Sequence, residues 1–170
     1  MDQRSFIEKR PHLKDFIEFL DVLNKESERG AALISLAMID GLLEKTILAF
    51  LIDDKESKRL LEGFNAPLGN LSTRASAAFS LGLISEKEFR ECTRLRKVRN
   101  EFAHSVHQKF SDQCVRDICA TLEFSIRDEP DKKVEPRSQF STAAISLILN
   151  LTNRPAYVAK KRIVYHEWPY

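Results

Sequence analysis

The sequence predicts an all-α fold, a single-domain bundle of about six helices. Apolar residues recur at the spacing of amphipathic helices through most of the chain, and no segment predicts a strand with confidence. Only 5 glycines and 6 prolines occur in 170 residues, which disfavours a fold that needs many tight turns. With 43% hydrophobic and 31% charged residues, the chain has the composition of a globular domain that can bury a sizeable core.

The first two helices are predicted from their apolar patterns. Residues 11–25 begin with Pro11, which suits the first turn of a helix, and carry apolar residues at helical spacing. Residues 28–52 are apolar nearly all round, which is typical of a helix at the centre of a bundle. Charged residues interrupt this second segment, so it is predicted to be a buried helix and not a membrane span.

Helix-breaking and helix-capping residues divide the next part of the chain into short segments. We expect a short helix over residues 57–61 and a loop over residues 63–70, which is rich in glycine, proline and asparagine. Ser72 is a candidate cap for the following helix, and Gly82 is expected to stop it.

The sequence predicts the starts of two further helices. Ser85 and Glu88 have the spacing of a capping box, and the helix they begin is predicted to run through Phe102. Ser111 and Asp112 offer the start of another helix.

The domain organisation is predicted in four parts. Residues 1–126 form the helical core, and residues 127–137 are a charged linker with two prolines. Residues 138–152 form an apolar C-terminal helix that packs on the core or on a second subunit, and its strongly apolar pattern spans about residues 140–151. Residues 153–170 are a basic and aromatic tail with no clear element.

The commonest enzyme motifs are absent from the sequence. There is no GxGxxG, P-loop, HExxH or GxSxG pattern, which excludes the usual nucleotide-binding, metalloprotease and hydrolase signatures. No DNA-binding motif is recognisable, and a net charge of +2 does not by itself indicate a nucleic-acid partner, although one remains possible. We therefore predict no cofactor and no metal site.

The cysteines and the first residues predict a cytoplasmic protein. The three cysteines, Cys92, Cys114 and Cys119, form no CxxC pair and are odd in number, so neither a disulfide framework nor a zinc site is expected. The charged start has no apolar core of a signal peptide, and no membrane partner is expected.

The segment that could carry chemistry is RLRKVRNEFAHSVH, in which Arg99 and His104 form an R-x4-H pattern with Asn100 after the arginine. Positions five apart lie about 140° apart around a helix, so Arg99 and His104 cannot share one face. Arg96, Asn100, His104 and His107 can share one, because their spacings are four, four and three.

Two interpretations of Arg99 stay open. In the structural one, Arg99 crosses the bundle and pairs with Asp40 or Glu44, two carboxylates inside the apolar helix that need a cation. In the catalytic one, Arg99 holds a phosphate and His104 acts as general acid or base, as in a metal-independent ribonuclease.

The tail suggests contacts with other molecules. The basic run Lys160, Lys161 and Arg162 stands beside several aromatic residues, a pattern that occurs in nucleic-acid binding and also in docking to a protein surface. The apolar helix of residues 138–152 and this tail together predict a homodimer, because monomers seldom expose large apolar patches.

Two stretches, APLGNLSTRASAAFSLGLIS and LRKVRNEFAHS, resemble the bacterial mannitol operon repressor family. The likeness covers residues 28–125 and extends more weakly to the apolar helix near Ile145. The R-x4-H element is similar to the signature of the wider HEPN group of helical domains, many of which cleave RNA. The mannitol-repressor resemblance implies an all-helical fold and negative regulation of transcription. The HEPN resemblance implies a site of Arg99, Asn100 and His104, composed across a dimer.

Two functional hypotheses follow. The first is a mannitol-repressor-like bacterial transcriptional regulator that acts as a co-repressor through contacts with another regulatory protein. The second is a HEPN-type metal-independent ribonuclease that uses Arg99 and His104. The small net charge favours the first, and the intact set of Arg99, Asn100 and His104 keeps the second open.

Overall fold

The computed structural model describes residues 13–127 and 133–169, and within them it is all-helical, as predicted, with no strand. In chain order the elements are α2 (Lys14–Leu23), α3 (Glu28–Phe50), α4 (Lys55–Leu61), α5 (Leu71–Ser80), α6 (Glu86–His104), α7 (Gln113–Ala120), α8 (Pro136–Thr152), α9 (Arg154–Val158) and the 3-10 turn η2 (Ala159–Lys161). Pro11, expected to open the first helix, lies outside the described residues.

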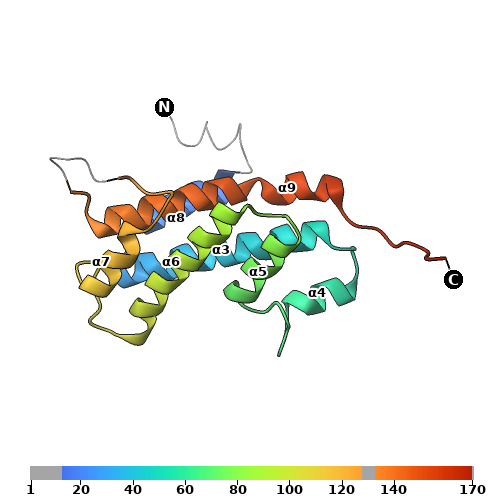
Figure 1. Ribbon diagram of the computed structural model, residues 1–170, viewed down its shortest axis with the longest axis horizontal. Coiled ribbons are helices and arrows are strands. Elements are labelled where there is room, and N and C mark those ends of the chain that lie inside the picture. Colours follow the sequence, from blue (N-terminus) through green and yellow to red (C-terminus); the bar gives the residue numbers. More distant parts are fainter. Residues whose placement is uncertain (1–12, 128–132, 170) are drawn as a thin grey trace.

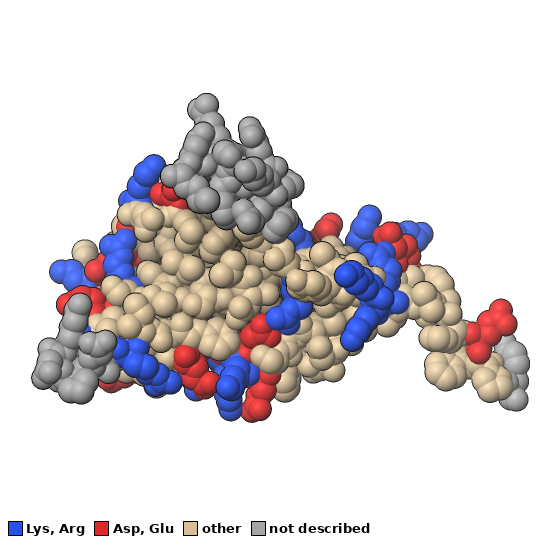
Figure 2. Space-filling model, turned by 90° about the horizontal axis from the view of Figure 1, so that it is seen from above, with Lys and Arg blue, Asp and Glu red and all other residues tan. Residues whose placement is uncertain are grey.

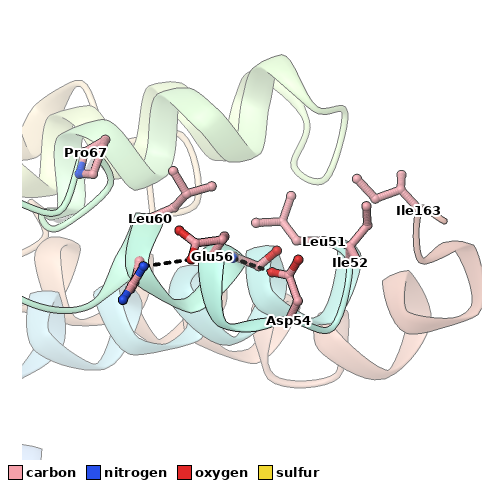
Figure 3. A pocket seen from close by; sticks show the side chains of 9 residues that line it. Leu51, Ile52, Asp54, Glu56, Leu60, Pro67 and Ile163 are labelled. Atoms are coloured by element: carbon pink, nitrogen blue, oxygen red, sulfur yellow. Dashed lines mark hydrogen bonds and ion pairs between the residues drawn. The ribbon is translucent and has the colours of Figure 1, made fainter. Parts of the chain in front are cut away.

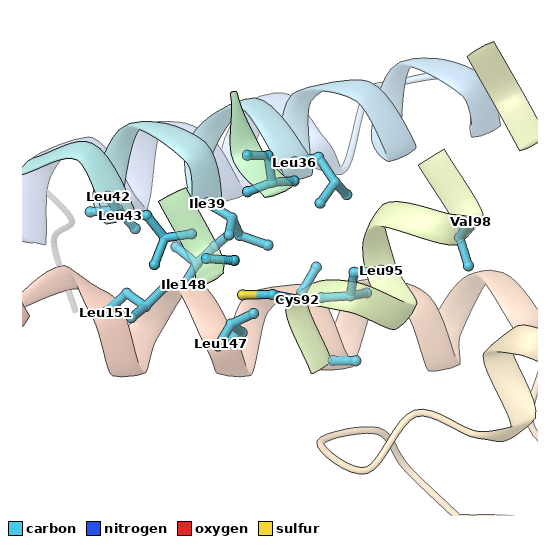
Figure 4. Packing of buried hydrophobic residues seen from close by; sticks show 14 of the residues in the cluster. Leu36, Ile39, Leu42, Leu43, Cys92, Leu95, Val98, Leu147, Ile148 and Leu151 are labelled. Carbon is cyan, nitrogen blue, oxygen red and sulfur yellow. The ribbon is translucent and has the colours of Figure 1, made fainter. Parts of the chain in front are cut away.

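The apolar helix α3 is the centre of the bundle, as its sequence predicts. It packs against α8, α5, α6 and α9 along its length, and α3 and α8 run side by side (Figure 1). Leu36, Ile39 and Leu43 of α3 are buried against Leu147 and Ile148 of α8 and against residues of α6 (Figure 4). This three-helix contact forms the main hydrophobic core.

Helix α8 is covered within the chain, which is the first of the two alternatives predicted for residues 138–152. Its residues Phe140, Ala143, Ala144, Leu147, Ile148 and Leu151 are fully buried. Because α3 has 23 residues, α5, α6, α8 and α9 can all pack on it. A second copy is therefore not needed to cover the apolar side of residues 138–152.

Local signals explain most helix ends, with one correction. The capping box is present, since Ser85 Oγ accepts a hydrogen bond from the Glu88 amide and Glu88 accepts one from the Ser85 amide. Gly82 follows α5 with φ of +69°, the left-handed conformation that glycine adopts at helix ends. Helix α5, however, is capped by Asn70 and not by Ser72, because Asn70 Oδ1 accepts from the Ser72 and Thr73 amides.

The segment after residue 153 is more structured than predicted. It forms α9 and η2, and only the residues beyond Lys161 are extended. Pro136 begins α8 at its first turn, four residues before the predicted start of the helix at residue 140. No helix in the described residues is long and apolar enough to cross a membrane.

Candidate functional site

Helix α6 carries the segment singled out by the sequence, and two buried carboxylates hold this helix in place. Glu91 is fully buried and accepts hydrogen bonds from the Glu123 and Phe124 amides, both at 3.0 Å. Glu88 lies 2.7 Å from Arg154 of α9, whose guanidinium also donates to the Leu83 carbonyl. Neither contact was predicted, although an acidic residue on the apolar side of a helix is a usable signal for a buried pair.

Burial acts to raise the pKa of Glu88, but the hydrogen bond from Arg154 and the hydrogen bond from the Ser85 amide act in the opposite direction. Together with the positive charge of Arg154 they hold the pKa of Glu88 below its ordinary value of 4.5. Glu88 is therefore ionised at neutral pH and ties α9 to the start of α6.

The predicted ion pair of Arg99 with Asp40 or Glu44 is wrong, because Arg74 of α5 takes this place. Arg74 Nη1 lies 2.8 Å from Asp40 Oδ2, and Nη2 lies 2.6 Å from Glu44 Oε2. The same guanidinium donates to the carbonyls of Leu68 and Leu61, each at 2.9 Å.

The side of α3 that carries Asp40 and Glu44 faces α5. The cation that pairs with them therefore comes from α5. The Arg74 side chain is only 8% exposed. A signal for this contact was available, since residues 63–85 contain no Asp or Glu and Arg74 must find its partner elsewhere.

Arg99, Asn100 and His104 lie in the last two turns of α6. Arg99 and Asn100 are half-buried and His104 is exposed. Within residues 13–127 and 133–169, Arg99 has no ion pair. Because α6 is a regular helix through His104, the side chains of Arg99 and His104 leave it about 140° apart. His107 is exposed beyond the end of the helix.

The three residues of the basic run near the C-terminus lie in different surroundings. Lys160 and Lys161 are exposed on η2. Arg162 is engaged with the body of the protein, since its Nε donates to the Ala49 carbonyl at 3.2 Å and its Nη1 lies 3.2 Å from Asp53.

The tail, residues 162–169, is anchored at the end of α3 and then leaves the bundle (Figure 1). The Ile163 amide donates to the Phe50 carbonyl at 2.9 Å, and the Tyr165 hydroxyl donates to Asp54 at 2.8 Å. The Ser57 amide and this hydroxyl lower the pKa of Asp54, and the bond to Asp54 raises the pKa of Tyr165.

Ile163 also lines an open hollow of about 380 Å³ between the end of α3 and α4, together with Leu51, Ile52, Leu60 and Pro67 (Figure 3). The aromatic rings of the tail are nevertheless largely in solvent, with Tyr165 73% and Trp168 79% exposed. An anchored extended segment with exposed aromatic side chains has the properties of a contact surface for a protein partner.

The outer face of α8 is a second candidate surface. Residues 138–153 contain no charged residue, and Figure 2, which looks onto the side of α8, shows charged side chains mostly around the edge of a broad uncharged face. Leu149 is exposed on α8 and Ile145 is half-buried.

No metal site accompanies these surfaces. The described residues contain no group of three or more His, Cys, Asp or Glu side chains that could hold a metal ion. The three cysteines are free thiols.

The fold and these surfaces define an all-helical bundle that presents an anchored tail and an uncharged helix face. Among solved structures, the X-ray structure of the MtlR–HPr complex from Escherichia coli contains a chain of similar fold. The two chains align with a TM-score of 0.59 and 23% identity over 84% of this chain and 96% of that chain. No family model and no curated protein match this chain.

At 23% identity the likeness shows the fold, an MtlR-like helical bundle. The resemblance to mannitol repressors therefore holds for the architecture. The HEPN resemblance of the R-x4-H element finds no support in these comparisons.

Proposed function

We propose that this chain is a mannitol-repressor-like bacterial transcriptional regulator of the cytoplasm that acts as a co-repressor through contacts with another protein. The observation that carries the proposal is the fold shared with a chain of the MtlR–HPr complex. The small net charge and the absence of a recognisable DNA-binding motif favour a protein partner over direct DNA binding.

The tail is the surface that we assign to this partner, and an HPr-type protein is the partner that the fold likeness suggests. Trp168 and Tyr165 offer large rigid side chains, and such residues supply much of the binding energy at protein interfaces. The anchors at Ile163 and Arg162 hold the start of the tail, so less conformational entropy is lost on binding.

Isothermal titration of the purified chain with the HPr protein of its own bacterium tests the proposal. We expect saturable binding that Trp168→Ala weakens at least about tenfold, as for an interface hot spot. Tyr157→Ala, which removes an exposed aromatic ring from α9, is the matched control and should leave the affinity unchanged. Absence of binding by the full chain, or equal losses in the two variants, contradicts the proposal.

We also propose a homodimer formed through the uncharged outer face of α8. Charged residues are usually depleted at the centre of an interface, and this face has none over residues 138–153. Sedimentation equilibrium should give a dimer that Leu149→Asp dissociates and that Phe64→Asp, at a fully exposed loop position, leaves intact. A monomer at about 10 μM full-length chain contradicts the proposal.

The ribonuclease remains a second candidate because Arg99 has no carboxylate partner in the described residues and is free to meet a phosphate. In this proposal Asn100 assists Arg99, and His104 is the general acid or base. Incubation with labelled total RNA, with and without chelator, decides it. Chelator-resistant cleavage that is lost in His104→Ala supports the enzyme, and cleavage that survives in His104→Ala, or no cleavage at all, refutes it.

A further inference from the structure

A small hollow lies between α5 and α6, two helices that pack against each other in front of α3 (Figure 1). Its volume is about 160 Å³. Its apolar lining consists of Leu71, Ala75, Phe89 and Cys92, and its polar lining consists of Ser72, Ser76, Thr93 and Arg96. Neither the fold nor the proposed protein contacts use this hollow.

Arg96 is a half-buried cation, and no carboxylate in residues 13–127 or 133–169 neutralises it. It has no ion pair in the residues that the structure describes, whereas Arg74, Arg94 and Arg154 all have carboxylate partners. The surrounding sequence explains this difference, because residues 63–85 and residues 92–100 contain no Asp or Glu. A partly desolvated guanidinium without a counter-charge favours the binding of an anion.

Hydroxyl donors complement this charge. The side chains of Ser72 and Ser76, one turn apart on α5, make no hydrogen bond within the described residues. Thr93 is different, since its hydroxyl already donates to the Phe89 carbonyl at 3.0 Å. The hollow therefore presents the guanidinium of Arg96 and two free hydroxyl groups.

The negative groups near the hollow are compensated. Burial and the charges of Glu88 and Glu91 raise the pKa of the Cys92 thiol to about 12, so this side chain is neutral. Glu88 is paired with Arg154, and Glu91 lies 3.5 Å from Arg94 and accepts two backbone amides. Their field on an anion at the mouth of the hollow is correspondingly reduced.

We propose that this hollow binds the phosphoryl group of a phosphate monoester, with Arg96 as the charge partner and Ser72 and Ser76 as hydrogen-bond donors. A guanidinium edge supplies two donors and the hydroxyls supply two more, which suits the three terminal oxygens of a phosphoryl group better than the two of a carboxylate. A volume of about 160 Å³ leaves room for only a small group next to the phosphate. This inference does not depend on the proposed co-repressor role.

Amide chemical-shift titrations of the full chain test the site. The probes are inorganic phosphate, glycerol 3-phosphate, a phosphoserine peptide and, as the carboxylate comparison, acetate. We expect saturable shifts at Ser72, Ser76 and Arg96 with the phosphorylated probes and weaker binding of acetate. Preference for glycerol 3-phosphate identifies a free metabolite as the ligand, and preference for the peptide identifies a phosphorylated protein.

Matched variants separate a specific site from general attraction. Arg96→Gln and Lys97→Gln remove the same charge from adjacent positions, but only Arg96 lines the hollow. We expect Arg96→Gln to weaken phosphate binding about tenfold and Lys97→Gln to change it less than about twofold. If Arg96→Gln does not fold, the Ser72→Ala and Ser76→Ala double variant takes its place and should also weaken binding.

Three outcomes overturn the inference. They are equal losses in Arg96→Gln and Lys97→Gln, a loss confined to Arg99→Gln, and no saturable shift around the hollow at about 20 mM phosphate, a concentration far above useful affinity.

Discussion

Single charged side chains join the helices of this protein at three points. Arg74 ties α5 and the loop before it to α3, Glu88 ties α9 to α6, and Glu91 ties the segment after α7 to α6. In each case one buried or nearly buried group satisfies several partners from different elements. These residues therefore fix how the helices meet, which apolar packing alone leaves less specific.

Replacing Arg74 by methionine should destabilise the protein by about 3 kcal/mol, because it leaves Asp40 and Glu44 without a counter-charge. One oxygen of Asp40, Oδ1, is already buried without a hydrogen bond, so the carboxylate depends on the bond that Arg74 donates to Oδ2. Urea denaturation measures the loss. Arg59→Met, which breaks an exposed pair with Glu56, is the control and should cost less than about 1 kcal/mol. A loss below 1 kcal/mol in Arg74→Met would contradict the role given to this residue.

Arg154→Met should destabilise the protein at pH 7 and much less in acid. The pKa of Glu88 in the folded protein lies below its ordinary value of 4.5, so its ionised form stabilises the fold above that pH, and this stabilisation is lost as the pH falls through the folded value. Thermal unfolding at pH 7 and at about pH 3 measures the difference. Arg59→Met, which breaks the exposed pair with Glu56, is the comparison. A difference between wild type and Arg154→Met that stays the same at both pH values would refute the assignment.

At the scale of single residues, the sequence predicts that the carboxylates of α3 need a cation but does not predict which cation pairs with them. It does not favour Arg74 over Arg99 as the partner of these two carboxylates. The identity of the cation depends on which side of α3 faces α5, a packing choice that periodicity cannot supply for a helix that is apolar nearly all round.

At the scale of elements, the predicted helices are present and their ends follow local chemistry. The capping box of α6 and the glycine after α5 were read correctly from spacing alone. The start of α5 was misplaced because Asn70 and Ser72 both suit a cap, and only the backbone geometry shows that Asn70 accepts the free amides. Helix α9 was missed because five residues are too few for a periodic pattern.

The central position of α3 predicts the cost of truncating its side chains. Leu36→Ala, Ile39→Ala and Leu43→Ala should each lower the free energy of unfolding by about 2–5 kcal/mol, because all three side chains are buried in the core. Leu33→Ala on the same helix is the control, since Leu33 is exposed and should cost much less. Chemical denaturation of the four variants gives the comparison. Similar small losses at all four positions would place α3 at the surface.

At the scale of the whole molecule, the all-helical bundle was predictable and the path of the tail was not. An extended segment has no periodicity, and its anchors are backbone contacts such as the bond from the Ile163 amide to the Phe50 carbonyl. The candidate surfaces were likewise predictable only in part. The uncharged stretch on α8 is visible in the sequence, but only the structure shows that its other side is buried in the core.

Removal of residues 162–170 should leave the bundle folded. The anchors of the tail are a few hydrogen bonds and one ion pair at the surface, so the free energy of unfolding should fall by less than about 2 kcal/mol. Removal of residues 136–170 takes α8 as well and should abolish cooperative unfolding. Circular dichroism during thermal unfolding distinguishes the two truncations. Loss of cooperative unfolding in the shorter truncation would show that the tail belongs to the core.

The partnership of α3 with α8 has a consequence for synthesis on the ribosome. Helix α3 emerges early, but its most extensive neighbour begins only at Pro136. During most of translation the side of α3 that contacts Leu147, Ile148 and Leu151 has no cover, and exposed apolar surface of this kind invites aggregation. We therefore expect the core around α3 to be completed only after α8 has been synthesised, and a chain truncated before α8 to expose this apolar surface.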